Sequence, residues 1–279
     1  MTPPDGAPGT GRPCESRGML RRLDLVFCVD LTGSMGGLIA AARAHIGRVL
    51  DALKVELQDD LRVGLVGYRD HSDGPKLLQV ESLTTDVEKV RAAINEAKVD
   101  GGGDAPEAVF AGLVKCLELP WAEGSYRVVI LIGDAPPHSV GAPGDSYKVD
   151  PTGLTLDDVA NRMETEGLFV HALSLSPHDK VMENAFRRLS ISTGGTYSDA
   201  TSPDAAMKIV GTVTQQFLRD LDFDRRLLER LKQGVVVPEP KHDDDVVPTR
   251  DELLAKALDV PVQEIWGGLM RLRRRRLFS

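Results

Sequence analysis

Apolar and polar residues follow two patterns along this chain, and the two patterns alternate over most of its length. Short, nearly continuous apolar runs predict buried strands, whereas longer segments with apolar residues on one helical face predict amphipathic helices. The predicted strands are 23–30, 60–70, 75–83, 126–136, 168–176 and 196–200. The predicted helices are 35–57, 85–98, 105–119, 154–167, 178–195 and 204–232. This alternation predicts an α/β protein: a doubly wound, Rossmann-like, mostly parallel six-stranded sheet with helices on both faces.

The two ends of the chain differ from this alternating region. Residues 1–20 are rich in proline and glycine and are predicted to form a disordered leader. The α/β domain is predicted to occupy residues 21–233, followed by a proline- and aspartate-rich linker at 234–250. Residues 251–279 are predicted to form a helical, basic tail, which is too short to build a core of its own.

Composition narrows the class of protein. The 279 residues are 42% hydrophobic, as in an ordinary globular protein, and their net charge of −8 argues against a nucleic-acid binder as a whole. No apolar run approaches the roughly 18 residues of a membrane span, and the first residues lack the apolar core of a signal peptide. Cys14, Cys28 and Cys116 give no disulfide framework, and we expect the last two to be buried. We therefore expect a cytoplasmic protein, and the Ala-, Leu- and Arg-rich style favours a bacterial one.

Oxygen-bearing side chains gather in three loops that connect strands to helices. The loops are DLTGSM at 30–35, GGGDAPE at 101–107 and LIGDAPPH at 131–138. In an open parallel sheet, ligands bind outside the carboxyl ends of the strands. Hydroxyl and carboxylate oxygens suit a hard divalent ion, so Mg²⁺ (or Mn²⁺ or Ca²⁺) is the expected cofactor. The candidate metal ligands are Asp30, Thr32, Ser34, Asp104, Glu107 and Asp134.

With these three motifs, the chain resembles the von Willebrand factor A domain family over roughly residues 22–220. The resemblance implies a metal-ion-dependent adhesion site in which Thr32 and Ser34 bind the ion directly. It also implies that Asp30 and Asp134 act through water, and that a carboxylate from a partner completes the shell of the ion. In relatives with this fold, that exchange is coupled to movement of the last helix of the domain.

The middle loop departs from the family pattern. Family members usually have a threonine where this chain has Asp104, whereas Glu107 matches a glutamate that binds metal in integrin β subunits. Either carboxylate could therefore be the remaining ligand, and Glu107 could instead cap its own helix.

The segment GYRDHSD at 67–73 is similar to A domains found beside atypical α-kinases and in bacterial intracellular proteins. Its Arg69, Asp70, His71 and Asp73 are expected either near the metal site or in a solvated loop tied by Arg–Asp pairing. His71 and His138 could approach each other above the sheet. However, no spacing in the sequence supports a zinc site.

The resemblance favours a protein-interaction module over an enzyme. The partner would present Asp or Glu, and an AAA+ ATPase or a multiprotein complex is the kind of partner that bacterial relatives suggest. An aspartyl phosphatase needs a second carboxylate two residues after Asp30, where this chain has Thr32. Nucleophilic catalysis by Ser34 would need a positioned base, and no phosphate-cradle motif is present. A metal-dependent phosphoesterase is the alternative.

The tail carries a separate signal. LAKALDVPVQEIW, at 254–266, resembles a helix–turn–helix fragment with Asp259 in place of the usual turn glycine. A basic cluster follows. Its members are Arg271, Arg273, Arg274, Arg275 and Arg276. Three interpretations stay open: docking on this protein or a partner, a nucleic-acid contact that would make the protein a DNA-associated adaptor, and contact with an anionic membrane.

Overall fold

The computed structural model describes residues 21–176, 178–200, 202–238 and 247–278, so the predicted leader and Cys14 lie outside the described residues. A six-stranded sheet with the order β3-β2-β1-β4-β5-β6 forms its centre. Only β3 runs antiparallel to its neighbour within this sheet. The strands are β1 Leu23–Asp30, β2 Leu61–Tyr68, β3 Leu78–Thr84, β4 Tyr126–Gly133, β5 Leu168–Ser174 and β6 Tyr197–Asp199. The predicted doubly wound α/β fold is confirmed.

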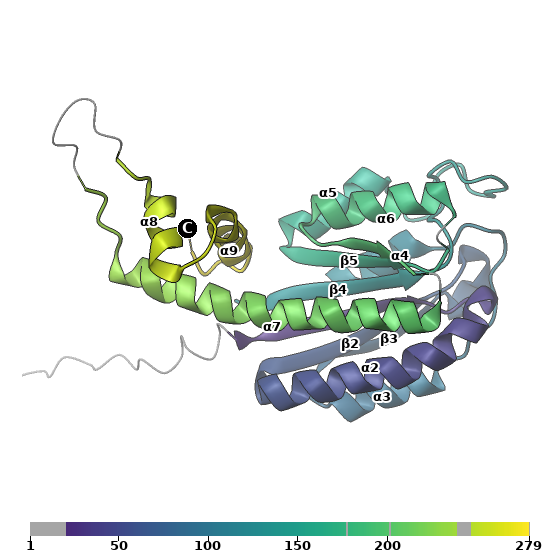
Figure 1. Ribbon diagram of the computed structural model, residues 1–279. Helices are drawn as coiled ribbons and strands as arrows, with labels where there is room; N and C mark the ends of the chain where they lie inside the picture. The colour runs from purple at the N-terminus through teal and green to yellow at the C-terminus, as the bar shows by residue number, and fades with distance from the viewer. Residues whose placement is uncertain (1–20, 177, 201, 239–246, 279) are drawn as a thin grey trace, which may run out of the picture.

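Helices cover both faces of the sheet (Figure 1). One face packs against α2 Gly36–Leu57, α3 Val87–Glu96 and α7 Pro203–Gln233. The other packs against α4 Val109–Leu117, α5 Leu156–Thr165 and α6 Lys180–Ser192. Short 3₁₀ helices are η1 Gly33–Met35, η2 Gln58–Asp60 and η3 His71–Lys76. Among the described residues, no helix is long and apolar enough to cross a membrane.

The central strand β1 shows why the apolar runs in the sequence are nearly continuous. Leu25 and Phe27 belong to the core on the α2 face, whereas Val26 and Cys28 belong to the core on the α4 face. Successive side chains of a strand point to opposite faces, so a strand covered on both sides needs apolar residues at every position. Cys28 and the α4 residue Cys116 are both buried free thiols, as expected.

The helix predicted around Pro106 is shorter in the structure. α4 begins at Val109, and Glu107 pairs with Pro137 in an isolated parallel bridge before it. Pro106 therefore precedes the helix instead of lying in its first turn. The N-cap position is Ala108, without a side-chain cap, so the alternative in which Glu107 caps its own helix is wrong.

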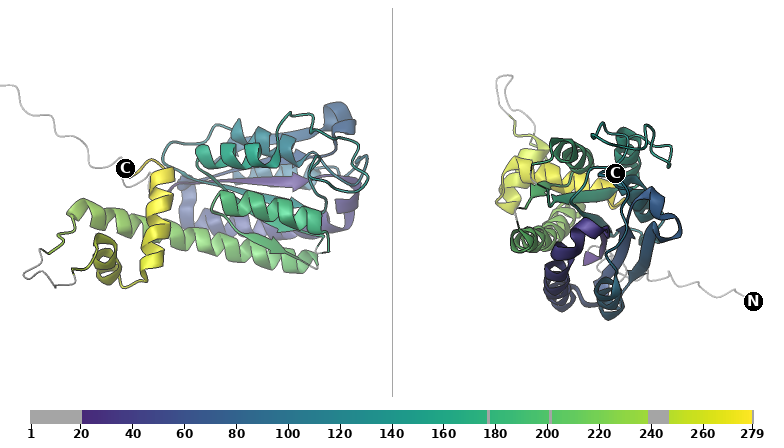
Figure 2. Two further views of the ribbon diagram at one scale, coloured as in Figure 1. Left: turned by 90° about the horizontal axis from the view of Figure 1, so that it is seen from above. Right: turned by 90° about the vertical axis from the view of Figure 1, so that its right-hand side faces the viewer.

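The tail packs on the end of α7, which extends beyond the sheet (Figures 1 and 2). It forms α8 Arg250–Leu258 and α9 Val262–Arg274. Its apolar residues share a small core with α7, in which Leu227, Leu254 and Leu272 are buried. Asp259 ends α8 in the left-handed region, at φ 55° and ψ 52°, the conformation for which a turn glycine is usual. The tail thus docks on the domain of its own chain.

Three of the five arginines in the basic cluster take part in this docking. Arg271 donates to Asp224 on α7 at 3.0 and 2.7 Å, and Arg275 donates to Gly124 O at 3.0 Å. Arg274 pairs with a carboxylate of α5 at 2.9 Å. Arg273 and Arg276 are exposed. The cluster therefore serves largely to attach α9 to the domain.

Candidate metal centre

The first and third candidate ligand loops leave neighbouring strands at the same edge of the sheet. β1 and β4 pair in parallel, with Val29 opposite Ile132. Asp30 is the last residue of β1, and Asp134 follows directly after β4. Because the strands are adjacent and in register, the two carboxylates emerge side by side, as the sequence pattern predicts.

Two hydroxyls connect these carboxylates. Thr32 donates to Asp30 Oδ1 through both its backbone N, at 2.8 Å, and its Oγ1, at 2.6 Å. Ser34 Oγ lies 3.1 Å from Thr32 Oγ1 and donates to Asp134 Oδ1 at 3.0 Å. A hydroxyl that donates its hydrogen to a carboxylate keeps its oxygen lone pairs for a cation. The two hydroxyl oxygens are therefore oriented by the carboxylates behind them.

The glycine run brings Glu107 next to Thr32. Glu107 N donates to Pro136 O at 2.9 Å, which fixes its backbone against the loop after β4. Gly102 has a φ of 91°. A Cβ on it would lie 3.1 Å from Glu107 Oε1 and 3.4 Å from Thr32 Cβ. The backbone at Gly102 thus passes between the two side chains, where there is little room for a side chain of its own.

The carboxylates in this group lack compensation for their charge. Burial, with the nearby Asp134, raises the pKa of Asp30 to about 7. Burial, with the charges of Asp30 and Asp70, raises the pKa of Glu107 to about 9. Asp30 Oδ2 and Glu107 Oε2 are shielded from solvent and have no hydrogen-bond partner within the described part of the chain. Buried acceptors without a donor are costly, and a divalent cation among these oxygen atoms would compensate their negative charge, so this donor set fits one.

Asp104 lies in a different cluster. Ser146 N donates to Asp104 Oδ2 at 2.6 Å. One carboxylate oxygen of Asp104 lies within 4.8 Å of ligand atoms from Asp70 and His138. Of the two carboxylates that the sequence left open, Glu107 is therefore the one that the structure places beside Thr32.

The segment after β2 is not a solvated loop. Arg69 and Asp70 are both buried, with exposed fractions of 5% and 1%. Arg69 pairs with Asp100, which lies outside the segment, at 3.2 Å. Asp73 accepts a hydrogen bond from Gly102 N at 3.0 Å and so helps to fix the backbone of the glycine run. GYRDHSD was the sequence signal for these residues, but it did not reveal that they are buried.

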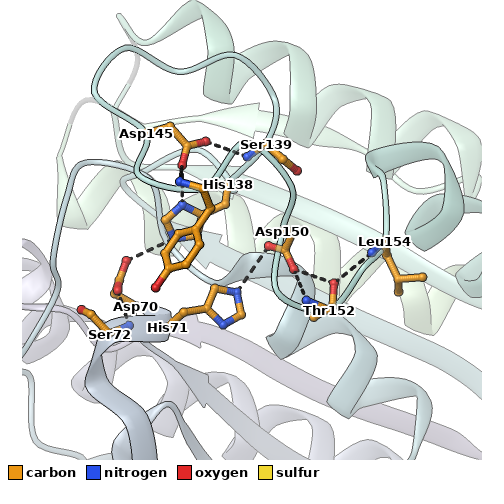
Figure 3. A network of polar contacts seen from close by, with 10 residues as sticks. Asp70, His71, Ser72, His138, Ser139, Asp145, Asp150, Thr152 and Leu154 are labelled. Atoms are coloured by element: carbon orange, nitrogen blue, oxygen red, sulfur yellow. Dashed lines mark hydrogen bonds and ion pairs between the residues drawn. The ribbon is translucent and has the colours of Figure 1, made fainter.

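His138 also has neighbours that the sequence did not indicate. Asp70 and Asp145 lie at the two nitrogen atoms of its ring, at 3.1 and 2.9 Å (Figure 3). The rings of His71 and His138 lie 5.5 Å apart, but His71 is paired with Asp150 instead, at 3.4 Å. The two histidines do approach each other above the sheet, yet they belong to different hydrogen-bonded pairs.

Residues 24–140 match the family model of the von Willebrand factor A domain. The chain is 33% identical over 141 residues to the alpha-protein kinase vwkA of Dictyostelium discoideum. That match covers 49% of this chain and 23% of the kinase, so the chain spans about a quarter of the kinase's length.

Solved structures show the same fold. The pilus adhesin SpaC of Lactobacillus rhamnosus GG superimposes with a TM-score of 0.56 at 17% identity, over 72% of this chain and 30% of the adhesin. A von Willebrand factor type A structure from Catenulispora acidiphila has a TM-score of 0.53 at 15% identity, over 71% of this chain and 42% of that one. At such low identities, the likeness concerns the fold alone.

Proposed function

Since residues 24–140 match the family model of the von Willebrand factor A domain, we propose that this chain is a protein-interaction module whose binding site depends on a divalent cation, Mg²⁺ in the first place. Thr32, Ser34 and Glu107 would hold the ion through their side-chain oxygens. Asp30 and Asp134 would hold the two hydroxyls in position, because each accepts the hydrogen of one of them. When bound, the ion supplies an open position for an oxygen ligand from a partner.

One observation carries this proposal: a buried group of oxygen atoms that includes two carboxylate oxygens without a hydrogen donor. Asp30 Oδ2 and Glu107 Oε2 are these oxygens. A protein interior tolerates buried carboxylates when a cation or a set of donors compensates them. Thr32 and Ser34 leave the centre of the group lined with oxygen, which matches the preference of Mg²⁺.

The partner that fits this site is a protein with an exposed Asp or Glu. Its carboxylate would enter from the loop edge of the sheet, where η1 and the glycine run border the site. An AAA+ ATPase or a multiprotein complex stays a prediction as the source of that carboxylate, and so does a cytoplasmic location.

The alternative functions have less support. In a phosphoesterase Ser34 would be the nucleophile and Asp134 its base, but the same hydrogen bond orients Ser34 Oγ as a metal ligand, and no further observation favours the catalytic role. A DNA-associated adaptor would need the arginines of the tail, but Arg271 and Arg275 are engaged with α7 and Gly124. We therefore propose a non-enzymatic module.

Calorimetric titration with Mg²⁺ and Mn²⁺ tests the proposal. We expect the wild-type chain to bind one ion at the site, and Ser34→Ala to lose binding because one of the two hydroxyl ligands is gone. Asp59→Asn is a suitable control. Asp59 is an aspartate with a fully exposed side chain in η2, before the start of β2 and so at the opposite edge of the sheet.

Each outcome of the titration either supports or refutes the proposal. Binding that is lost in Ser34→Ala and kept in Asp59→Asn would support the proposal. Equal binding by wild type and Ser34→Ala would refute the assignment of the site, and absence of binding in the wild type would refute metal dependence.

A further inference from the structure

A second polar cluster lies outside the proposed Mg²⁺ site and is formed by three loops. Asp70 follows β2, Asp104 belongs to the loop before α4, and His138 follows β4. One ligand atom from each of these residues lies within 4.8 Å of the other two. His138 and Asp70 are buried, with exposed fractions of 0% and 1%, so the cluster is part of the interior and not a solvated surface.

The hydrogen bonds of Asp145 determine which nitrogen of His138 carries a proton. Asp145 accepts from Ser139 N at 2.7 Å and from Tyr147 N at 2.8 Å, and its third contact is His138 Nδ1 at 2.9 Å. A carboxylate that accepts from two backbone N–H groups acts as an acceptor, so His138 Nδ1 is the donor to it.

The other nitrogen of His138 faces an acceptor. Nε2 lies 3.1 Å from Asp70 Oδ2 (Figure 3), and Asp70 Oδ1 already accepts from Ser72 N at 2.5 Å. In the neutral ring with its proton on Nδ1, Nε2 carries a lone pair. Two acceptor atoms at this distance require either a proton, on the ring or on the Asp70 carboxyl, or a cation between them.

The remaining charges of the cluster favour a cation over a proton alone. Asp104 Oδ1 is shielded from solvent and has no hydrogen-bond partner within the described ranges. A protonated His138 would supply one positive charge against the carboxylates of Asp70, Asp104 and Asp145. A divalent ion would compensate the cluster further and satisfy Asp104 Oδ1.

We propose that His138 Nε2, Asp70 and Asp104 bind a divalent transition-metal ion of the Zn²⁺ type, at a site distinct from the proposed Mg²⁺ site. Imidazole nitrogen combined with carboxylate oxygen favours such ions over Mg²⁺. The bond from His138 Nδ1 to Asp145 has the form in which a carboxylate orients a metal-binding histidine. Ligand bonds of about 2.1 Å around a tetrahedral ion separate the ligand atoms by about 3.4 Å, a separation that small side-chain movements would reach.

The ion would join the loop after β2 to two of the loops that form the proposed Mg²⁺ site, the loop before α4 and the loop after β4. Asp104 and Glu107 lie three residues apart on the same loop, so a metal at Asp104 would fix the segment that carries Glu107. His138 lies four residues after Asp134 and would anchor the loop after β4 in the same way. The second site would thus be a structural support for the first.

Titration of the metal-free full chain with Co²⁺, followed by visible absorption, tests this site because Co²⁺ reports a nitrogen ligand and low coordination number. We expect one Co²⁺ per chain to give such a spectrum and Zn²⁺ to displace it. His138→Asn keeps an amide near the position of Nδ1 for Asp145 but removes Nε2, so the spectrum should be lost. Asp104→Asn should weaken Co²⁺ binding at least about 10-fold.

Two matched variants serve as controls. His71→Asn removes the neighbouring histidine, which is paired with Asp150, and should keep the spectrum. Ser34→Ala removes a ligand of the proposed Mg²⁺ site and should also keep it. Asp104→Asn is the variant least expected to affect folding, because an amide oxygen can still accept from Ser146 N.

Loss of the spectrum in His138→Asn and weaker binding in Asp104→Asn, with both controls unchanged, would support the second site. The proposal would be overturned by a wild-type chain that binds neither Co²⁺ nor Zn²⁺, or by Asp104→Asn binding Co²⁺ as the wild type does. Loss in Ser34→Ala would also overturn it, since the ion would then belong to the first site. Mg²⁺ binding at Ser34 is measured separately, so either proposal can fail without the other.

Discussion

Two buried carboxylates at opposite ends of this molecule differ in how their charge is compensated. Asp224, where α7 meets the tail, accepts hydrogen bonds from Nε and Nη2 of Arg271 and lies 3.5 Å from Arg275. Asp30, at the carboxyl end of β1, accepts from the Thr32 hydroxyl and lies near another carboxylate, Asp134. Both residues have an exposed fraction of 0%. The two carboxylates are thus equally buried, but Asp224 lies beside two positive charges whereas Asp30 lies near another carboxylate.

The difference separates a structural role from a binding role. Burial raises the pKa of Asp224, and the positive charges of Arg271 and Arg275 work against that rise. The chain supplies its own cations there, so that end is complete without a ligand. At Asp30, the described residues supply the Thr32 donors but no cation, and burial together with the charge of Asp134 raises the pKa of Asp30 to about 7. The uncompensated end is where an ion from solution would stabilise the fold.

The largest expected effect on stability comes from removing the carboxylate charge at the compensated end. Asp224→Asn would leave Arg271 and Arg275 buried without their shared carboxylate. Removal of one partner from a buried ion pair costs about 3–5 kcal/mol, and we expect a loss of that size in urea unfolding. Asp222→Asn is the matched control on the same helix, because its carboxylate is 58% exposed and pairs with Arg225. It should change stability by less than about 1 kcal/mol. Equal losses in the two variants would contradict the comparison.

His171 shows a third solution, in which a buried titratable group stays neutral. It lies on β5 against Phe217 of α7, at 5.0 Å between ring centroids, and burial lowers its pKa to about 4. The unfolded chain gains a proton at His171 near pH 6.5, but the folded chain gains it only near pH 4. Stability should therefore fall as the pH drops through this window, by about 3 kcal/mol at the acid end.

Unfolding measured from pH 7 to pH 4 checks this expectation. His171→Gln cannot be protonated, so its stability should depend less on pH in that range. An identical pH dependence in wild type and His171→Gln would show that the buried ring does not contribute.

At the uncompensated end, the same type of substitution should not destabilise the fold. Asp30→Asn keeps an oxygen to accept from Thr32 and removes the repulsion from Asp134. In metal-free buffer at pH 8, we expect no loss of stability, in contrast to Asp224→Asn. Mg²⁺ affinity should fall about 10–100-fold, because Asp30 orients the Thr32 hydroxyl. Thermal unfolding with and without Mg²⁺ measures both effects, and strong destabilisation without metal would contradict this account.

The smallest effect is expected at the exposed part of the tail. Arg273→Ala removes a side chain on the exposed side of α9, and we expect a change in stability of less than about 1 kcal/mol. Arg275→Ala, in contrast, removes the donor to Gly124 O and should loosen the tail measurably, as judged by limited proteolysis. If both variants released the tail equally, the charge of the cluster as a whole, and not its specific contacts, would hold it.

The sequence predicted those features that depend on local pattern. The strand ending at Asp30 and the strand before Asp134 are adjacent because strongly apolar runs form the centre of a parallel sheet. The proximity of the two carboxylates, Asp30 and Asp134, could therefore be predicted from the sequence.

The features that escaped prediction depend on how loops pack. The distinction between Asp104 and Glu107 depends on the bridge between Glu107 and Pro137, which joins segments 30 residues apart. The position of His138 between Asp70 and Asp145 depends on loop conformations that no periodicity encodes. The docking of the tail likewise depends on the contact between Arg271 and the buried Asp224, which no sequence pattern indicates.

A Mg²⁺ titration of one glutamate variant and one aspartate variant tests the central claim most directly. We assign Glu107 to the Mg²⁺ site and Asp104 to the second cluster. Calorimetry should therefore show Mg²⁺ affinity reduced at least about 10-fold in Glu107→Gln and close to the wild-type value in Asp104→Asn. Lost affinity in Asp104→Asn with unchanged affinity in Glu107→Gln would contradict it.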